Sequence, residues 1–373
     1  MNRLGSKRKL LNVAVVGCGH ISEEHLKAWK NLNANIVAVC DTNISLARSK
    51  AEKWKIPRFY EDVSKMIEVE DLDAVSVCTP PNVRMSVIKP IVERGVHVVV
   101  EKPFAMTIEE AKRIIELKDK YGVKVTVVHN WLFSHIMERV LKYLRGGYVG
   151  EIASVEISMY HTSSDPMAAD PSHWCHKIPA GRFGENLPHP IYIIRAILGD
   201  VSVRHIIGLK LGSYQWMPID ELKVLLEDGK GKLATINISF NAHRPETILN
   251  IVGDKGAIHA NLSNNILIKK GYRDISMRDI AIDNLKTITD IVSSSFLITI
   301  AIITGQYKGM YTNFMKKFAE SILNNTQPPV SAEEALKVVE LHAKLTSKIH
   351  EFYFNKEITK KSMSRKAEEA LKV

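Results

Sequence analysis

Two glycines and an aspartate near the N-terminus have the types and spacing that bind a dinucleotide. Gly17 and Gly19 follow the apolar run Val13–Val16, and Asp41 ends a second apolar run, Ile36–Cys40. Gly17 allows a tight turn, and Gly19 places no side chain between the backbone and a pyrophosphate. The following helix would direct its free N–H groups at the phosphate, and the Asp41 carboxylate would accept the ribose hydroxyls. This order of elements predicts a nucleotide cofactor.

Ser22 occupies the place of the third glycine of this fingerprint. That glycine serves helix–strand packing, so a small serine is compatible with the motif. Asp41 would repel a 2′-phosphate, and Thr42 and Asn43 add no positive charge to offset the repulsion. The prediction is therefore NAD, with NADP less favoured. The alternative is a strand-to-helix turn in an α/β protein that binds no nucleotide.

A lysine follows another apolar run, in the sequence Glu101-Lys102-Pro103. Beside a bound nicotinamide, Lys102 would hydrogen-bond or deprotonate a substrate hydroxyl. The alternative interpretation is a surface lysine paired with Glu101. The apolar run before it ends at Thr79-Pro-Pro-Asn82, whose prolines would stiffen a loop under the cofactor.

A carboxylate and a histidine lie four residues apart, at Glu185 and His189. On one helix they would share a face, and the carboxylate would orient the imidazole for proton exchange with an alcohol. An ordinary polar pair is the alternative. His173 and His176 could chelate a metal together with His189 or Cys175. Their spacing matches no closed zinc pattern, and we predict no metal.

Alternating strands and helices must position these residues in the first third of the chain. Strands are predicted at Val13–Val16, Ile36–Cys40, Ala74–Cys78, His97–Val100 and Val123–Val128. Helices are predicted at Ser22–Leu32, Ile44–Trp54, Val83–Arg94 and Ile108–Tyr121. Buried strands separated by helices specify a doubly wound parallel sheet, in which ligands bind beyond the carboxyl ends of the strands.

The pattern changes after about Asn130, where strands follow one another without helices. Such a run predicts an open antiparallel or mixed sheet. The strands are Ile152–His161, Arg204–Leu211, Glu221–Leu226, Leu233–Phe240, Thr247–Val252 and Ala257–Leu262, with helices at His135–Arg145, Tyr311–Leu323 and Ala332–His350. The predicted domains are residues 1–129 for the nucleotide, residues 130–354 for substrate and oligomer contacts, and a charged tail at 355–373.

Composition narrows the class of protein. The 373 residues are 45% hydrophobic, which suits two cores, and the net charge of +10 comes from scattered lysines and arginines. We therefore expect a solvated basic surface and no nucleic-acid partner. The widely spaced thiols and the absence of a recognisable secretory signal favour a reduced, cytoplasmic protein. These cysteines are Cys18, Cys40, Cys78 and Cys175.

Residues Ile291–Tyr307 contain no charged side chain. Seventeen such residues fall at the lower limit for a membrane span. A buried helix or an apolar surface used in oligomer contact is the favoured interpretation, and membrane attachment is the alternative. We predict no membrane association.

Together these motifs resemble the Gfo/Idh/MocA family of oxidoreductases, named for glucose–fructose oxidoreductase and inositol dehydrogenase. The resemblance covers nearly the whole chain and includes His25, a Gly253–Gly256 turn and Pro328–Val330. It implies an N-terminal Rossmann domain and a C-terminal α+β domain with an open, mostly antiparallel sheet. The implied cofactor contacts are Gly17, Gly19, His20, Ile21, Asp41, Thr79, Pro80, Glu101 and Lys102.

The resemblance also implies roles for individual residues. In the family the lysine at the position of Lys102 lies by the nicotinamide and the substrate hydroxyl, and the peptide before its proline is often cis. The histidine matching His189 is an acid/base, and the carboxylate matching Glu185 assists it. Homodimers or homotetramers packed through the open sheet are also implied. The candidates for substrate contact are Asn130, His161, Trp174, His176 and Arg182.

The departures from the family pattern concern substrate-facing positions. Glu185 and Tyr192 each stand where the family has Asp, and Arg84 replaces a histidine. His129-Asn-Trp131 stands where an Arg-and-Pro pattern is usual. We predict an NAD-dependent oxidoreductase for a secondary alcohol or ketone of a sugar, cyclitol or related polyol. A non-catalytic NAD-binding ligand sensor and a redox-neutral enzyme that uses NAD transiently are the alternatives.

Overall fold

The computed structural model describes residues 10–212, 214–271, 276–305 and 307–354. The chain forms two compact units. The N-terminal unit comprises Met1–Ser134 and Lys308–Glu340, and the C-terminal unit comprises His135–Tyr307 and the chain from Leu341. The predicted division at 129/130 differs from this arrangement because residues 308–340 return to the N-terminal unit. The predicted tail at 355–373 lies outside the described residues.

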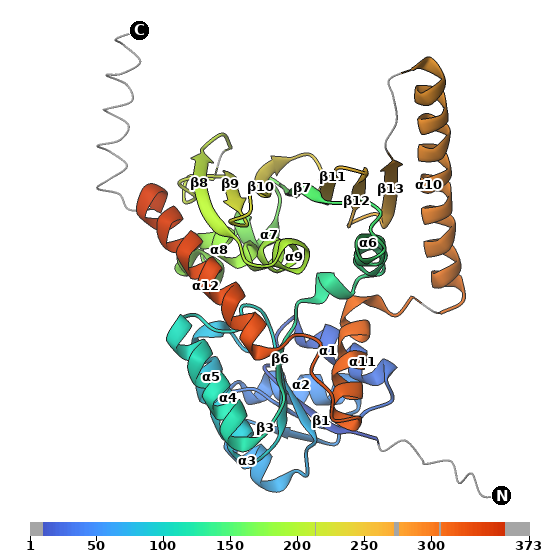
Figure 1. The fold of residues 1–373 in the computed structure, drawn as a ribbon. Coiled ribbons are helices and arrows are strands. Elements are labelled where there is room, and N and C mark those ends of the chain that lie inside the picture. The colour runs from blue at the N-terminus through green and yellow to red at the C-terminus, as the bar shows by residue number, and fades with distance from the viewer. Residues whose placement is uncertain (1–9, 213, 272–275, 306, 355–373) are drawn as a thin grey trace, which may run out of the picture. The chain divides into compact units, whose positions relative to one another are not determined.

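The N-terminal unit contains a six-stranded parallel sheet of order β3-β2-β1-β4-β5-β6 (Figure 1). Its strands are β1 (Asn12–Val16), β2 (Asn35–Cys40), β3 (Arg58–Tyr60), β4 (Ala74–Val77), β5 (His97–Val100) and β6 (Val125–Val127). Its first helices are α1 (Ser22–Asn31), α2 (Ile44–Trp54), α3 (Val63–Val69), α4 (Arg84–Glu93) and α5 (Ile108–Tyr121). The short η1 (Pro81–Val83) and η2 (Asn130–Phe133) follow β4 and β6. The predicted doubly wound sheet is confirmed.

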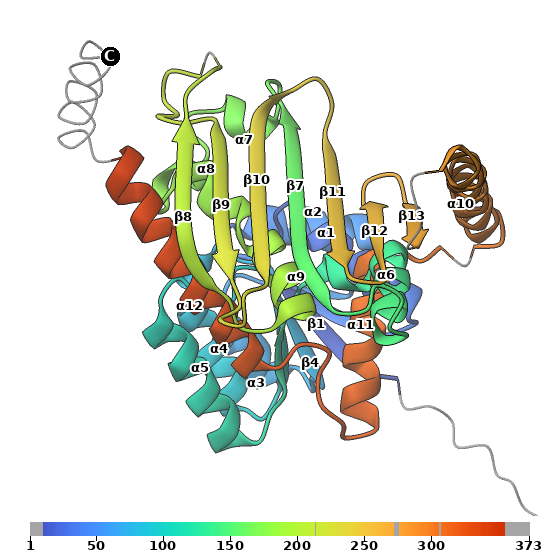
Figure 2. The ribbon, with the colours of Figure 1, turned by 45° about the horizontal axis from the view of Figure 1, so that its top comes forward.

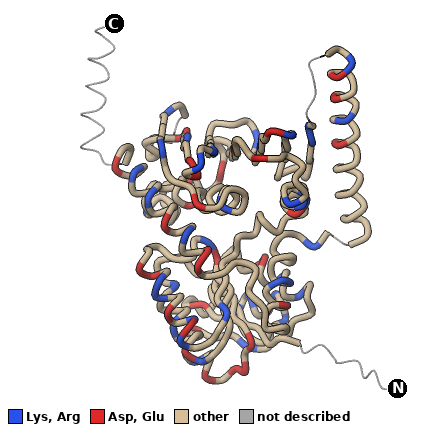
Figure 3. Tube along the Cα trace, in the orientation of Figure 1, with Lys and Arg blue, Asp and Glu red and all other residues tan. Residues whose placement is uncertain are grey.

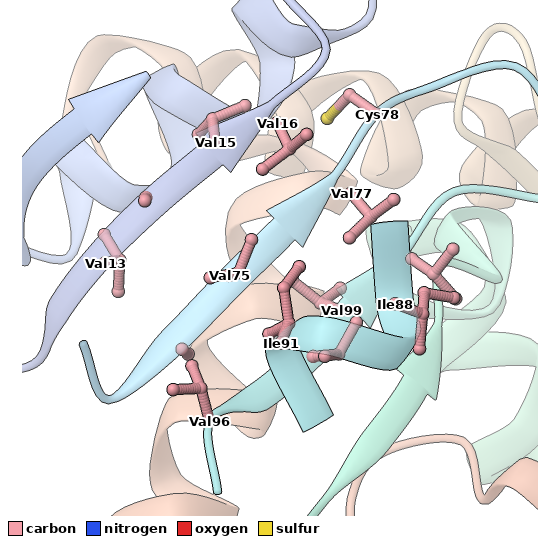
Figure 4. Close-up of a cluster of buried hydrophobic side chains, with 14 of the residues drawn as sticks. Val13, Val15, Val16, Val75, Val77, Cys78, Ile88, Ile91, Val96 and Val99 are labelled. Atoms are coloured by element: carbon pink, nitrogen blue, oxygen red, sulfur yellow. The ribbon is translucent and has the colours of Figure 1, made fainter. Parts of the chain in front are cut away.

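Valine-rich strands form the centre of this unit because both faces of the sheet are covered. Val13, Val15, Val75 and Val99 are fully buried in one cluster (Figure 4). The strand order reverses between β1 and β4, and every predicted nucleotide motif lies at a strand's carboxyl end. Such a reversal is where open α/β sheets bind ligands.

The late helix α11 (Gly309–Leu323) completes the N-terminal unit. Its Phe314 packs edge-on against Phe133 with ring centroids 5.0 Å apart, and Phe318 lies 6.4 Å from Trp29. Helix α12 (Ala332–Ile349) begins in this unit and continues into the C-terminal unit.

The C-terminal unit contains a seven-stranded sheet of order β13-β12-β11-β7-β10-β9-β8 (Figure 2). Only the pair β7–β10 is parallel, so the predicted mostly antiparallel sheet is confirmed. The strands are β7 (Ile152–Thr162), β8 (Ser202–Leu209), β9 (Glu221–Glu227), β10 (Leu233–Ala242), β11 (Glu246–Gly253), β12 (Gly256–Asn261) and β13 (Ile266–Gly271). Along β10 the buried Ala234, Ile236, Ile238 and Phe240 alternate with half-exposed residues, so one face of the sheet carries the core.

The helices of this unit include the predicted α6 (His135–Arg145) and several that the sequence patterns did not predict. The latter are α7 (Pro166–Ala169), η3 (Trp174–Lys177), α8 (Gly181–Asn186), α9 (Pro188–Leu198), α10 (Met277–Ile303) and the π-helical turn η4 (His350–Phe354). In Figure 1, α8 and α9 lie on one face of the sheet and α10 stands beside β13. Most of the uncharged segment 291–307 belongs to α10, and its side chains are largely exposed. The structure therefore excludes a buried helix, the first of the two favoured interpretations, and leaves an apolar surface.

Candidate active site

The turn after β1 requires glycine at its first position. Gly17 has φ +91°, and its N–H donates to the carbonyl oxygen of Cys40 at 2.8 Å. A Cβ on Gly17 would lie 2.8 Å from the carbonyl carbon of Cys78 and 2.9 Å from the nitrogen of Thr79. At Gly19 a Cβ would meet no atom within 4 Å. The first glycine therefore lets two strand ends approach each other, and the second leaves open space beside the backbone, as a pyrophosphate requires.

Ser22 performs a role that a glycine could not. Its side chain is fully buried, and its hydroxyl donates to the carbonyl oxygen of Gly19 at 2.6 Å. No side chain caps the N-terminus of α1. His20 is exposed beside Gly19, and Ile21 is half-buried against the core. The serine therefore reinforces the phosphate turn while filling the glycine's packing position.

Glu23 would place a negative charge near this turn, but two lysines compensate it. Burial raises the pKa of Glu23, yet hydrogen bonds from Lys50, Lys53 and Trp54 outweigh this effect and lower it to about 2. The Lys50 ammonium contacts the Glu23 carboxylate and lies 3.5 Å from the carbonyl oxygen of Gly19. Sequence spacing gave no sign of Lys50, because it reaches the turn from α2.

Backbone N–H groups hold the Asp41 carboxylate at the end of β2. Its Oδ2 accepts from the N–H of Cys18 at 2.7 Å, and its Oδ1 accepts from the N–H of Asn43 at 2.8 Å. The carboxylate is therefore fixed next to the glycine turn, where the motif places a ribose.

Glu101 at the end of β5 is buried and faces a histidine. Its Oε1 lies 2.9 Å from His25 Nε2 and accepts from the Tyr311 hydroxyl at 3.0 Å. Burial raises the pKa of Glu101, but the hydrogen bond and charge of His25 outweigh it and lower that pKa. Its Oε2 accepts the backbone N–H of Lys102 at 3.1 Å, and the Lys102–Pro103 peptide is cis. Glu101 thus anchors the backbone of the lysine loop.

Arg84 joins the loops that follow β4 and β5. Its buried guanidinium donates to the carbonyl oxygens of Thr79 at 3.1 Å and Lys102 at 3.3 Å, and it also contacts that of Pro103. Burial lowers the pKa of Arg84 to about 10. The assignment of Arg84 to the substrate-facing positions is therefore wrong, since its donors are turned to backbone carbonyls.

The loop after β4 carries a buried hydroxyl with no partner in the described part of the chain. Thr79 Oγ1 has no hydrogen-bond partner among those residues, and the neighbouring Pro80 is exposed. One edge of the sheet carries the Thr79 hydroxyl, the open space at Gly19 and the fixed Asp41 carboxylate. These residues fit a bound NAD, whose polar groups would supply the missing partner.

The C-terminal unit holds a buried ionic cluster around Arg182. The guanidinium donates to Asp165 at 3.1 and 3.2 Å, contacts the Glu185 carboxylate, and lies 5.5 Å from the Phe240 ring centroid. Burial lowers the pKa of Arg182, but Glu185 and Asp165 outweigh it and raise that pKa. Asp165 was missed because its partner lies seventeen residues further along the chain.

His161 extends this cluster from β7. Its Nδ1 lies 3.4 Å from Asp165 Oδ2, and its ring stacks on Phe240 with centroids 4.8 Å apart. The Nε2 atom is buried, and no residue in the described ranges hydrogen-bonds it. A polar atom left this way can hydrogen-bond a ligand hydroxyl.

The carboxylate–histidine pair lies on two helices. Helix α8 ends at Asn186 and α9 begins at Pro188, so Glu185 and His189 do not lie on one helix, the condition under which they would share a face. Pro188 lacks the N–H that would continue α8. His189 Nδ1 lies 2.8 Å from the Tyr192 hydroxyl, so the residue that replaces the family aspartate is a partner of this ring.

His173 and His176 hydrogen-bond neighbouring backbone groups, and Trp174 is partly exposed. His173 Nδ1 accepts the N–H of Cys175 at 3.3 Å, and His176 Nε2 donates to the carbonyl oxygen of Met167 at 2.9 Å. Trp174 is 38% exposed beside His173. Within the described ranges, no group of three His, Cys, Asp or Glu side chains is arranged to hold a metal.

The structure thus divides the predicted site residues between the two units. The nucleotide residues, Lys102 and Asn130 belong to the N-terminal unit, where buried Asn130 begins η2. His161, Arg182 and Glu185 are brought together through Asp165 in the C-terminal unit. His189, Trp174 and His176 belong to the same unit.

Comparison with known proteins agrees with this geometry. The D-apiose dehydrogenase of Paraburkholderia graminis is 26% identical over 253 residues, which are 66% of each chain. The myo-inositol 2-dehydrogenase of Thermotoga maritima is 24% identical over 87% of this chain and 92% of its own. The crystal structure of the WlbA dehydrogenase from Bordetella pertussis, in complex with NADH and UDP-GlcNAcA, superposes with a TM-score of 0.75 at 20% identity, covering 93% of this chain and 97% of the other.

Two family models match consecutive parts of the chain. Residues 11–129 match the oxidoreductase family's NAD-binding Rossmann fold. Residues 142–351 match the C-terminal alpha/beta domain of the same family. The predictions of family, oxidoreductase class and NAD cofactor are confirmed, and the chain belongs to the Gfo/Idh/MocA family of NAD-binding oxidoreductases.

Proposed function

We propose that this protein transfers a hydride between NAD and a secondary alcohol or ketone of a sugar, cyclitol or related polyol. One observation carries the proposal: the lysine loop after β5 is anchored at the same sheet edge as the dinucleotide turn. Gly17 lies against Cys78 and Thr79, and Arg84 ties Thr79 to the carbonyl of Lys102. The nucleotide turn and the lysine are thereby held by one set of backbone contacts.

Each chemical role belongs to a named residue. NAD supplies the hydride-accepting or hydride-donating ring when it is bound. Lys102 polarises or deprotonates the substrate hydroxyl, and His189 relays the proton. Tyr192 holds the ring of His189, and Glu185 contributes through its ion pair with Arg182. The roles of Lys102 and His189 are inferred from the family motif, and mutation of each residue tests them.

The relatives support a polyhydroxylated substrate. Those named above include dehydrogenases of D-apiose and myo-inositol. His161 offers a buried Nε2 that has no hydrogen-bond partner among the described residues. A free ring nitrogen of this kind suits a hydroxyl group of a sugar or cyclitol.

Calorimetric titration with NADH and, separately, NADPH tests the cofactor. Because Asp41 would repel a 2′-phosphate, we expect tight binding of NADH and weak binding of NADPH. Deuteride from labelled NADH should then appear in an added keto-sugar or inosose. Binding of neither dinucleotide, with retained cofactor excluded by mass spectrometry, would overturn the proposal.

Two departures from the family pattern are also compatible with a ligand sensor. Glu185 and Tyr192 replace family aspartates, and a ligand sensor that binds NAD without turnover would show NADH binding and no isotope transfer to any substrate. A redox-neutral enzyme would form product with no net change in NADH.

We also propose a cytoplasmic homodimer or homotetramer. The four cysteines are free and buried, which suits a reducing compartment. The open sheet of the C-terminal unit has long edge and face surfaces that a second copy would cover. Light scattering that gave a monomer mass near 42.0 kDa would refute the oligomer.

A further inference from the structure

Helix α10 presents its apolar residues to the outside and its polar residues to the sheet. Towards β13, Asp290 Oδ2 accepts the N–H of Lys269 at 2.9 Å, and Ser294 Oγ accepts the N–H of Leu267 at 3.3 Å. Asp283 pairs with Lys270 at 2.6 Å. The helix is therefore attached to the edge strand by hydrogen bonds and ion pairs, and Ser294 is its one buried residue.

The opposite side of α10 is an exposed apolar stripe, Leu285, Ile288, Val292, Phe296 and Ile303. These side chains are 63%, 57%, 60%, 63% and 78% exposed, and spacings of three, four, four and seven residues place them on one face. The stripe spans about 27 Å. At about 60% of the roughly 150–200 Å² that a large apolar side chain offers, the five expose roughly 500 Å². Patches of this size on soluble proteins mark interaction sites.

Several hydroxyl groups of α10 and of its C-cap Thr304 donate to carbonyl oxygens of the helix itself. Thr299 Oγ1 donates to the carbonyl oxygen of Ser295 at 2.8 Å, and Thr304 Oγ1 donates to that of Ile300 at 2.8 Å. Thr287, Thr289 and Ser293 likewise donate to carbonyl oxygens of the preceding turn. Burying this side of the helix against an apolar partner would therefore leave none of these donors unpaired.

The distribution of charged residues along α10 indicates which kind of partner the stripe binds. All charged residues of α10 lie between Arg278 and Asp290, and its C-terminal half has none (Figure 3). A two-fold interface brings each surface against its own copy, so an uncharged stripe avoids like-charge contact. Membrane-surface helices instead have strongly basic polar faces, whereas α10 carries three aspartates (Asp279, Asp283 and Asp290) against the two cations Arg278 and Lys286.

A membrane-spanning role conflicts with the connections of α10. This helix alone among the described residues is long and apolar enough to cross a membrane. Its middle is hydrogen-bonded to β13, and its ends lead to β13 in one unit and α11 in the other. Because Ser134 and His135 join the same two units by one peptide bond, a bilayer core of about 30 Å cannot separate them.

We propose that the apolar stripe of α10 docks on a second copy of this chain and clamps the homo-oligomer. The inference rests on the proposed oligomer and adds a named contact to it. Because a stable interface buries about 800 Å² per partner, the stripe supplements other contact surface, such as the open sheet.

Sedimentation velocity of the full chain tests this contact. The double variant Val292→Lys/Phe296→Lys keeps good helix formers while placing two like charges on the stripe. We expect its dissociation constant for self-association to rise at least a hundredfold relative to the wild type. Val69→Lys, at a 66% exposed apolar residue of α3, is the matched control and should leave association unchanged. Circular dichroism of each variant checks that the helices are retained.

Cross-linking gives a second measurement. The native cysteines are buried, so Phe296→Cys can be labelled with a benzophenone maleimide and photolysed. We expect a product of twice the 42.0 kDa chain mass, with the label attached to the partner. If the double variant associates like wild type and no such product forms, the α10 contact is refuted while the oligomer stands. A monomeric wild type refutes both the oligomer and the α10 contact. If the wild type floats with phosphatidylserine vesicles and the double variant does not, the stripe binds a membrane instead. Hydride transfer is read separately, so a failure of the enzyme proposal is distinguishable.

Discussion

At the residue scale, function in this chain depends on groups held by backbone contacts. Glu101 accepts the N–H of Lys102, and Arg84 donates to its carbonyl oxygen, so both sides of the lysine residue are fixed. A long flexible side chain that starts from a fixed backbone loses less freedom when it reaches a substrate. We therefore expect mutation of Lys102 and mutation of the residues that anchor its backbone to affect turnover and stability differently.

Replacing the lysine tests the proposed proton transfer. Lys102→Ala should reduce turnover by roughly a hundredfold or more while NADH affinity changes little, because general acid–base catalysis contributes ~10²–10⁴-fold. Steady-state kinetics and NADH titration measure the two effects. Lys112→Ala, at an exposed lysine of α5, is the control. Unchanged turnover in Lys102→Ala would remove the assigned role.

Arg84 is expected to act by positioning. Arg84→Lys keeps the charge but loses the planar fork that reaches several carbonyls, so kcat should fall roughly tenfold while the Kd for NADH stays within about threefold. The free energy of unfolding should drop by about 1–3 kcal/mol, because buried carbonyls lose their donors. If stability falls while kcat per folded molecule is unchanged, Arg84 serves the fold alone.

At the element scale, the turn between β1 and α1 uses its two glycines for different purposes. Gly17 allows β1 to approach the end of β4, whereas Gly19 faces open space. A methyl group at the first position would disturb the protein itself, and a methyl group at the second would meet only a ligand.

The two alanine variants therefore form a matched pair. Gly19→Ala should leave the thermal midpoint within about 2 °C of wild type and weaken NADH binding at least tenfold, because its Cβ enters only the pyrophosphate space. Gly17→Ala should lower both stability and NADH affinity, since φ +91° and the contact with Cys78 exclude a Cβ. Thermal scans and calorimetry measure these effects. Equal NADH affinity in Gly19→Ala and wild type would contradict the proposed phosphate position.

At the scale of the whole molecule, stability should depend on pH through buried carboxylates. Burial raises the pKa of Asp165, but hydrogen bonds from His161 and Arg182 outweigh it and hold that pKa well below its usual range. A carboxyl with a lowered folded-state pKa stabilises the protein above its unfolded value of about 3.9, and this contribution is lost as pH falls through the folded pKa.

The variant Asp165→Asn isolates this contribution. It should be less stable than wild type at pH 7 by about 1–3 kcal/mol, because Arg182 loses a charged partner. It should also lose less stability than wild type between pH 5 and pH 3, because residue 165 then no longer takes up a proton on unfolding. Urea unfolding at each pH measures both. Asp71→Asn, at an exposed aspartate, should change stability little, and parallel pH curves for wild type and Asp165→Asn would reject this origin.

The parallel sheet, the NAD turn and the family could all be predicted from the amino-acid sequence. These follow from local order, since apolar runs, glycines and an acid at fixed spacing fix backbone geometry within a few residues. Helices at 44–54, 108–121 and 135–145 were predicted at their observed bounds for the same reason. The three-residue strand β3 and the short helices α7 and α8 were not predicted, because segments this short are too short to show a hydrophobic periodicity.

Contacts between residues distant along the chain could not be predicted from the sequence and are seen in the folded protein. Asp165 meets Arg182, Tyr311 meets Glu101, and Arg84 bridges two loops through carbonyl groups that exist at every residue. The orientation of α10 was also undetermined, because an apolar run specifies a helix but not which side faces its own sheet. Hydrogen bonds from the β13 edge selected the polar side, and the apolar side was left for a partner.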